Sequence, residues 1–193
     1  MKKLIFLISI LLNGCFAIAQ QQKIIYPGYT SYWNAKTLIP DSVLWTITKD
    51  HLTGTKIKRN NQFHPEKGMK NLKRDYVNSH YDQGHNSPYD DNYWSTDAEY
   101  QCFSYCNMFP QLHLLNAQTW ERLEDYSRQM ALKYGSCSVK TSWIGIDKKI
   151  GPDSVTVPLY CLKTIYYNHI VEKYKMPNRD TVIRHIFSFY KIK

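Results

Sequence analysis

The sequence lacks several features that would place it in a specialised class. It has no internal repeat and no low-complexity block, which argues against a solenoid or a linker protein. Beyond residue 19 it has no apolar run of the roughly 20 residues that a membrane-spanning helix needs. Its 193 residues suffice for one domain with a substantial core, and we expect residues 20–193 to form that single domain.

The first residues have the pattern of a secretory signal peptide. Two lysines precede an apolar run over residues 4–12, and an A-x-A site ends at Ala19. We therefore expect residues 1–19 to be removed and the mature chain to be secreted or periplasmic. The run Leu-Asn-Gly-Cys that ends at Cys15 loosely resembles a lipoprotein cleavage box, so lipidation at this cysteine is the alternative prediction.

Acidic side chains are scarce in this chain. There are 16 Asp and Glu against 25 Lys and Arg, which gives a formal net charge of +9. Cleavage after Ala19 would remove two lysines and no acid, leaving a charge of +7. A basic secreted domain is suited to a polyanionic partner such as nucleic acid, although many proteins with a basic pI bind none.

Cysteine is the next informative residue type. Of five cysteines, four would remain in the mature chain: Cys102, Cys106, Cys137 and Cys161. An even number in an exported protein predicts two disulfides, and the sequence does not separate the three pairings. A zinc site is the alternative, but the spacing of the first two cysteines has no matching second pair.

Residue patterns also predict the main secondary-structure elements. Apolar and polar residues alternate over 42–49, and 139–146 and 155–167 are rich in strand-forming residues, so three strands are expected there. Residues 20–40 are rich in Gln, Tyr and Pro and are expected to form an irregular exposed arm. The segment 96–105 fits either a strand or an irregular segment.

A helix is predicted from Asn116, a good N-cap residue, to the stop at Gly135. The residues of its expected buried stripe recur at three- to four-residue intervals: Trp120, Leu123, Ser127, Met130 and Tyr134. Glu124 lies eight residues after Asn116, about two helical turns, so both side chains can share one face. Capping of the helix is the structural alternative to a functional role for Asn116.

The stretch from Asp82 to Glu124 has the groups needed for hydrolysis with one hard metal ion. His85, in a glycine-containing turn, supplies a base that titrates near neutral pH. Asn116 supplies an oxygen ligand, and Glu124 supplies a carboxylate to hold metal-bound water. A lone His or Asn is more often a surface or cap residue, so the specificity lies in the ordered set.

This ordered set resembles the DNA/RNA non-specific endonucleases, sugar-non-specific nucleases with a ββα-metal site that include endonuclease G. Their pattern is D-R-G-H, N-x-x-P-Q, a further Asn and W-x-x-L-E; here it reads Asp82-Gln83-Gly84-His85, Asn107-Met108-Phe109-Pro110-Gln111, Asn116 and Trp120-Glu121-Arg122-Leu123-Glu124. The similarity extends to a basic loop at Arg59 and a V-P-x-x-x-x-K strand ending at Lys163. It implies an α+β fold with a central antiparallel sheet flanked by helices and a ββα-metal (His-Me finger) unit.

The resemblance also implies a role for each site residue. His85 would be the general base that activates water for in-line attack on phosphorus. Asn116 would be the direct ligand of one Mg²⁺, with Mn²⁺ as the alternative ion, and Glu124 would fix the water around that metal. Asn107 would position His85 or the phosphate, and Arg59 would clamp the phosphate. The turn that aims the base would be shaped by Asp82 and Gly84.

One residue departs from the family pattern. Gln83 stands where the family has Arg, so a neutral amide replaces a charged fork that can contact phosphate. We expect weaker catalysis or a changed substrate preference, and not a loss of function. Three nearby cations could compensate: Lys58, Lys73 and Arg74.

Together these features predict a secreted, Mg²⁺-dependent, sequence-non-specific endonuclease that hydrolyses DNA, with RNA as a second candidate substrate. Non-specificity is expected because phosphate carries no base information. Gln83 motivates the alternative, a catalytically weakened or silent nucleic-acid-binding protein of the same fold. A producer of such a nuclease could need an inhibitor protein, which the chain does not identify.

Overall fold

A seven-stranded antiparallel sheet is the centre of the computed structural model, which describes residues 21–179 and 186–193. The strands in spatial order are β1 (Gln21–Ile25), β2 (Thr30–Asn34), β3 (Ile39–Thr48), β6 (Ser136–Ile150), β7 (Val155–Tyr167), β8 (Ile170–Pro177) and β9 (Lys191–Ile192). A separate hairpin pairs β4 (Tyr81–His85) with β5 (Met108–Leu112). This arrangement confirms the predicted α+β class, and β3, β6 and β7 confirm the three expected strands.

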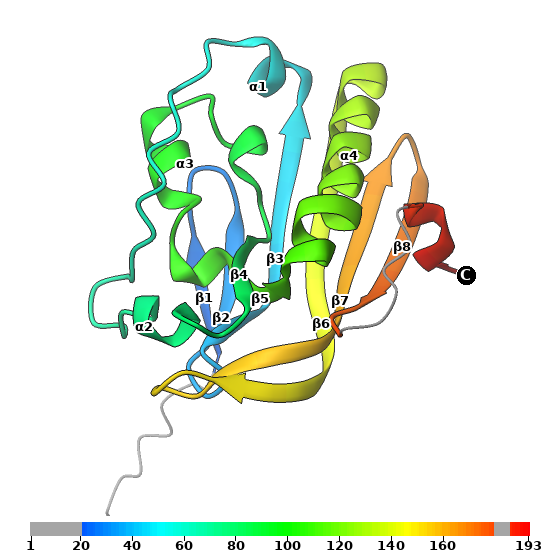
Figure 1. The fold of residues 1–193 in the computed structure, drawn as a ribbon. Coiled ribbons are helices and arrows are strands. Elements are labelled where there is room, and N and C mark those ends of the chain that lie inside the picture. The colour runs from blue at the N-terminus through cyan, green and yellow to red at the C-terminus, as the bar shows by residue number, and fades with distance from the viewer. Residues whose placement is uncertain (1–20, 180–185) are drawn as a thin grey trace, which may run out of the picture.

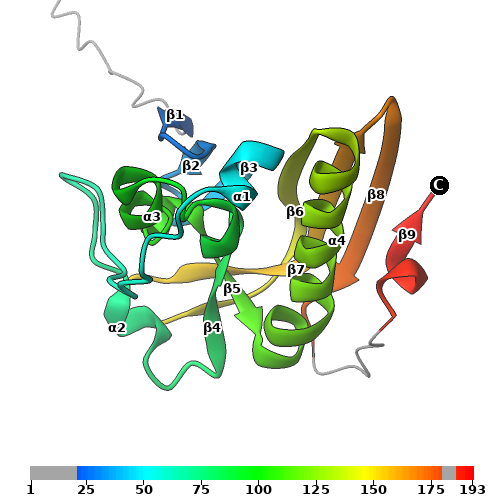
Figure 2. The same ribbon diagram turned by 90° about the horizontal axis from the view of Figure 1, so that it is seen from above.

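The long connection between β3 and β6 holds the hairpin and the described α-helices. These are α1 (Lys49–Thr53), α2 (Lys73–Tyr76), α3 (Thr96–Gln101) and α4 (Glu121–Tyr134). Shorter helical segments are η1 (Tyr89–Asp91), η2 (Tyr105–Asn107), the π-helical η3 (Leu115–Trp120) and, near the C-terminus, η4 (Phe187–Tyr190). In Figures 1 and 2, α4 runs alongside β6 and β7, and β4–β5 leads directly into η3 and α4. The ββα unit is therefore present.

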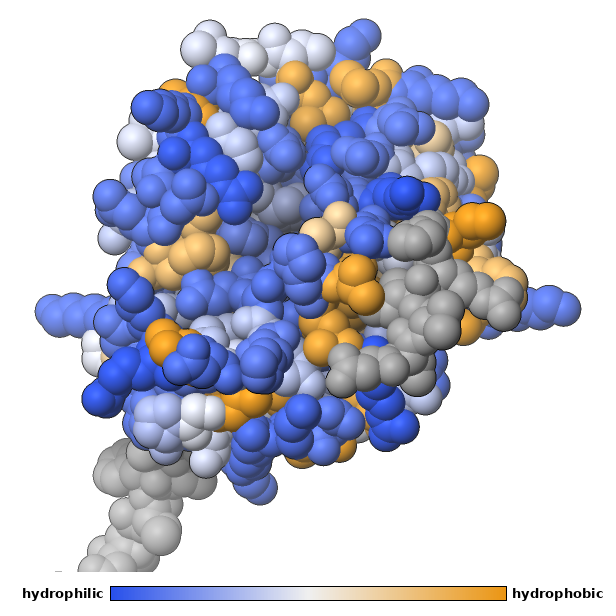
Figure 3. All heavy atoms as spheres, viewed as in Figure 1, coloured by the Kyte–Doolittle hydropathy of each residue, from blue (hydrophilic) through white to orange (hydrophobic). Residues whose placement is uncertain are grey.

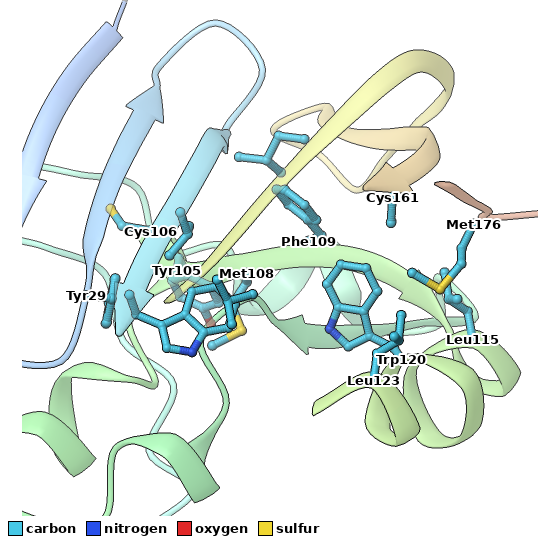
Figure 4. Packing of buried hydrophobic residues seen from close by; sticks show 14 of the residues in the cluster. Tyr29, Tyr105, Cys106, Met108, Phe109, Leu115, Trp120, Leu123, Cys161 and Met176 are labelled. Atoms are coloured by element: carbon cyan, nitrogen blue, oxygen red, sulfur yellow. The ribbon is translucent and has the colours of Figure 1, made fainter. Parts of the chain in front are cut away.

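The main core fills the space between the large sheet and the ββα unit. Five almost completely buried side chains meet here (Figure 4). They are Phe109 of β5, Trp120 of η3, Leu123 of α4, Cys161 of β7 and Met176 of β8. The outer face over this unit is mostly hydrophilic (Figure 3). Burial of the apolar face thus fixes the hairpin and helix against a rigid sheet, while their polar residues remain on the other side.

The prediction of an irregular exposed arm over residues 20–40 is wrong, because most of this segment forms β1, β2 and the start of β3. Its aromatic residues are core residues: the rings of Tyr26 and Tyr29 stack with centroids 4.4 Å apart, and Trp33 is buried. The Tyr29 hydroxyl donates a hydrogen bond to the Gln101 carbonyl at 2.8 Å. This hydrogen bond joins residues 72 positions apart, so the local sequence pattern did not reveal it.

The segment 96–105 is also corrected, since its first part is the short helix α3. Ser95 caps this helix, and its hydroxyl accepts a hydrogen bond from the Ala98 amide at 3.1 Å. Asp97 and Glu99 in the first turn complement the helix dipole. The cap and the two acids were present in the sequence and outweigh the strand propensity of the nearby aromatic residues.

The predicted disulfides are wrong, because all four cysteines of the described chain are free and buried. Cys102 packs with Phe103 in a small separate cluster, whereas the other three lie in the main core. The Cys102 thiol donates to the Glu99 carbonyl at 3.1 Å, and the Cys106 sulfur lies 3.4 Å from that of Met69. They pack as small apolar side chains. Within the described ranges no three His, Cys, Asp or Glu side chains gather to hold a metal, so the zinc alternative fails too.

The predicted signal peptide over residues 1–19 lies outside the described residues. Among the helices described, none is long and apolar enough to cross a membrane.

Candidate active site

The β4–β5 hairpin carries two of the predicted motifs and locks them together. In its register Asp82 is opposite Gln111, and His85 is opposite Met108. Gly84 lies against the buried Gln111 side chain: a Cβ at Gly84 would come within 1.9 Å of the Gln111 Oε1 atom. The glycine of the first motif is thus required by the glutamine of the second.

We expect Gly84→Ala to destabilise the protein by about 1–3 kcal/mol, as overpacking of a core does. Gln111 is fully buried, so it has no solvent space into which to move. Urea unfolding followed by circular dichroism measures the effect. Gly54→Ala is the control, because there the added Cβ would meet one backbone oxygen at 3.3 Å. Equal stability of the two variants would show that the Gly84 contact is not tight.

Asn107 fixes the chain that leaves His85. Its side-chain nitrogen donates to the Ser87 carbonyl at 2.7 Å and the Cys102 carbonyl at 2.8 Å, and its oxygen accepts from the Ser87 amide at 2.9 Å. The side chain is completely buried. Of its two predicted roles, this geometry favours positioning the segment of His85 over contacting phosphate.

His85 lies at the end of β4 in an aromatic surround. Its ring meets Phe103 edge to face with centroids 5.1 Å apart, and Phe63 at 5.6 Å. Its carbonyl accepts a hydrogen bond from the Trp120 indole at 3.1 Å, which ties β4 to the helix. Its Nε2 atom is buried and has no hydrogen-bond partner among the described residues. Burial, with a smaller effect from the Arg59 guanidinium, lowers the pKa of His85 to about 3, so the imidazole is neutral and, in this environment, a weak base.

Arg59 brings a positive charge to the same place. Its guanidinium lies 5.3 Å from the ring centres of both Tyr89 and Phe103, and its Nε donates to Asn61 Oδ1 at 2.6 Å. Aromatic faces attract a guanidinium in this way without neutralising it. The loop thus presents a charged fork beside His85, as predicted for a phosphate clamp.

Asn116 lies within the π-helical η3, and the prediction that it caps the helix is wrong: helical structure already begins at residue 113. Its amide nitrogen donates to Asp82 Oδ2 at 3.0 Å, and the same oxygen lies 2.9 Å from His113 Nδ1. Because the nitrogen is bound to Asp82, the carbonyl oxygen is the atom of this side chain that can bind a cation. π-Helical segments are frequent at functional sites.

Glu124 of α4 is paired with Lys163 of β7. The Lys163 Nζ atom is 3.5 Å from Glu124 Oε1 and 4.0 Å from the Trp120 ring centre, and its side chain is fully buried. Burial raises the pKa of Glu124 to about 7, against the opposing effect of the ammonium. Burial likewise lowers the pKa of Lys163, which the carboxylate opposes. Lys163 therefore holds Glu124 in place. The sequence had identified this lysine only as the last residue of the V-P-x-x-x-x-K pattern.

Arg128 is a residue that the sequence analysis missed. It donates to Asp91 Oδ1 at 3.0 Å and Asp125 Oδ1 at 2.5 Å, and Asp91 in turn accepts from the Trp45 indole at 2.8 Å. The sequence feature that could have identified Arg128 is its position four residues after Glu124, because side chains four residues apart share one face of a helix.

The site residues line two adjoining cavities that together form one groove. The larger, of about 470 Å³, includes Gln83 and Asp82; the smaller, of about 220 Å³, includes Glu124 and Arg128. Both cavities share three lining residues: Arg59, His85 and Asn116. Of the residues predicted to act in catalysis or metal binding, only Asn107 lines neither of these two cavities. A hollow of about 590 Å³ elsewhere contains none of them.

Comparison with known proteins agrees with this geometry. The model of the family described as DNA/RNA non-specific endonuclease matches residues 11–188. The chain belongs to that family. The predicted family and enzyme class, a nucleic-acid hydrolase, are therefore confirmed.

Curated relatives of this endonuclease-family chain are nucleases. It is 31% identical over 157 residues to nuclease 1, mitochondrial, of Schizosaccharomyces pombe, which covers 72% of this chain and 49% of that protein. It is 33% identical over 158 residues to the mitochondrial nuclease of Saccharomyces cerevisiae, covering 71% and 48%. It is 29% identical over 151 residues to human nuclease EXOG, mitochondrial, covering 70% and 41%. The chain thus spans about half the length of these relatives or less.

A solved structure shares the fold. It is the crystal structure of an EndoG/EndoGI complex, described as showing the mechanism of EndoG inhibition. The alignment has a TM-score of 0.78 at 20% identity and covers 89% of this chain and 80% of that one. This similarity confirms the predicted fold.

The predicted secreted or periplasmic location is contradicted by the same comparisons. The curated nucleases that the endonuclease-family chain matches are named as mitochondrial. The reasoning from a basic start and a short apolar run therefore gave the wrong location.

The residues of this family member fit a hydrated divalent ion. Hard cations such as Mg²⁺ prefer oxygen ligands and retain most of their waters, so they need few protein atoms. Asn116 offers a carbonyl oxygen and Glu124 a carboxylate to the smaller cavity. The absence of a dense His, Cys, Asp or Glu cluster from the described residues agrees with such an ion and not with a zinc cage.

Proposed function

We propose that the chain is a divalent-metal-dependent, sequence-non-specific endonuclease that hydrolyses phosphodiester bonds of DNA, with RNA as a second substrate. One observation carries this proposal: His85, Arg59 and Asn116 line both cavities of the groove. The proposed base, phosphate clamp and metal ligand therefore lie at one place. Mg²⁺ is the proposed ion because the donor atoms are oxygens and few.

The chemistry follows from these side chains. Arg59 would bind the scissile phosphate through its exposed guanidinium. His85 would take a proton from the attacking water, and the negative charge of a phosphate bound beside the ring would raise its pKa toward the range of a general base. Asn116 and Glu124 would hold the metal and its water shell. The bound ion would stabilise negative charge on the phosphate and the leaving oxygen.

Gln83 lines the larger cavity beside His85. Its Oε1 atom is buried and has no hydrogen-bond partner within the described chain. A neutral amide here would contribute less to phosphate binding than a guanidinium does, so Gln83 tunes the reaction and Arg59 supplies the main charge. The silent binder is the alternative, and the presence of His85, Asn116 and Glu124 in one groove argues against it.

A protein inhibitor is a candidate partner. The related fold of the EndoG/EndoGI complex is that of an inhibited nuclease, which supports this class of partner and identifies no member of it.

Asp82→Asn tests the metal site, because Asp82 orients the Asn116 amide. Loss of an outer partner of a metal ligand typically costs about 10- to 100-fold in metal affinity. We therefore expect the Mg²⁺ concentration for half-maximal plasmid cleavage to rise by about that factor. Asp97→Asn, in the first turn of α3, is the control and is expected to match the wild type. An unchanged Mg²⁺ dependence in Asp82→Asn would contradict the assigned ligand.

A further inference from the structure

The cations that line the groove differ in their partners. Arg128 is bound to two carboxylates, Asp91 and Asp125. Lys73, in the first turn of α2, is exposed and lines the larger cavity. Its ammonium has no carboxylate within 4.0 Å in the described part of the chain. With Arg59, it is a cation of the groove whose charge is available to a ligand.

The two ends of the groove also differ in charge. The smaller cavity has three carboxylate-bearing residues in its lining: Asp90, Glu121 and Glu124. The larger has one, Asp82, whose Oδ2 atom is within hydrogen-bond distance of Asn116 and His113. Lys56 pairs with Asp90 and Lys163 pairs with Glu124, so the smaller cavity is acidic but partly neutralised. A flanking phosphate would therefore be favoured at the larger end, where Lys73 has no carboxylate partner among the described residues. The acidic end suits the metal, and the Lys73 end suits a nucleotide.

The shape of the larger cavity fits this division. Its volume of about 470 Å³ lies in the range of small-ligand sites. Phe63, Tyr76, Val77 and Tyr81 contribute apolar or aromatic surface to its wall, and Val77 is 61% exposed. Such a wall can contact a sugar or a base without reading sequence.

The position of Lys73 also bears on Gln83. Both residues line the larger cavity, whereas Lys58 and Arg74, the other two cations that could have compensated for the neutral amide, line neither cavity.

We propose that the larger cavity binds the nucleotide that flanks the scissile phosphate, and that Lys73 contacts the phosphate of that nucleotide. The proposal rests on the nuclease function above and adds the side of His85 on which the substrate strand is bound. The substrate strand is held on the α2 side of His85, away from the carboxylates near α4.

The test measures binding and cleavage of a fluorescent single-stranded oligonucleotide. Binding is followed by anisotropy in chelator at several salt concentrations, so that no strand is cut, and cleavage is followed in Mg²⁺. The variants are Lys73→Gln, Lys73→Arg and Arg74→Gln; the last changes the adjacent exposed cation. We expect Lys73→Gln to weaken binding about 10-fold and to lower the salt slope by about 0.7, the value for one phosphate contact to a single strand. Lys73→Arg should keep both values, and Arg74→Gln should stay within about 2-fold of the wild type.

The outcomes separate the two proposals. If the wild type cuts but Lys73→Gln keeps the wild-type affinity and salt slope, the subsite is overturned and the nuclease function stands. If Lys73→Gln, unlike Lys73→Arg and Arg74→Gln, binds more weakly and with a smaller salt slope while the wild type never cuts, the subsite is supported and the nuclease function fails. If the wild type neither binds nor cuts, both are overturned.

Discussion

His85→Ala is expected to lower the rate of plasmid cleavage by about 1,000-fold, within the range for loss of a general base. The side chain is neutral through burial, and both cavities of the groove reach it. The rate is measured with protein in excess over supercoiled plasmid, so that product release does not limit it. His85→Ala should still bind DNA with near wild-type affinity, because Arg59 and Lys73 remain.

His169→Asn is the matched control for this prediction. His169 lies in the β7–β8 turn with a φ of 62°, a left-handed conformation that Asn tolerates. The groove residues do not include it. A rate for His85→Ala within a few-fold of that of His169→Asn would contradict the assignment of the base.

Lys163→Met is expected to destabilise the protein by about 3 kcal/mol at pH 8, the low end of the cost of breaking a buried ion pair. The substitution leaves the Glu124 carboxylate buried beside Trp120 without its ammonium partner. The pKa of Glu124 would then rise further above its present value of about 7, and activity would fall because a protonated acid cannot hold a metal shell. Urea unfolding gives the change in free energy.

A second substitution isolates the charge effect. Adding Glu124→Gln to Lys163→Met removes the unpaired carboxylate and should restore much of the lost stability, while activity stays low. Equal destabilisation in the single and double variants would mean that Lys163 acts through packing, and the pairing with Glu124 would then contribute little.

The order and spacing of the motifs predicted a ββα unit, and the structure contains it. His85, Asn116 and Glu124 were expected to converge, and the structure brings all three to adjoining cavities. The detailed helix start was wrong, since capping preferences describe local sequence only. Here contacts to Asp82, about 30 residues away, hold His113 and Asn116 inside the helical segment.

The remaining errors have the same physical origin. The β1–β2 segment was assigned to an arm because its pattern is irregular, yet Tyr29 and Trp33 are core residues through distant contacts. Arg128 was missed because its partner Asp91 is 37 residues away. The cysteines were paired on the expectation of export, and burial as separate thiols is a property of the three-dimensional packing.

The most direct test of the account is cleavage of supercoiled plasmid by the wild-type protein in Mg²⁺, with DNA binding followed in parallel. We predict nicking and then degradation in Mg²⁺, and none after a chelator is added, with binding retained. Salt-dependent DNA binding without cleavage in Mg²⁺, Mn²⁺ or any other divalent ion would contradict the account and would identify the protein as a silent nucleic-acid binder of the nuclease fold.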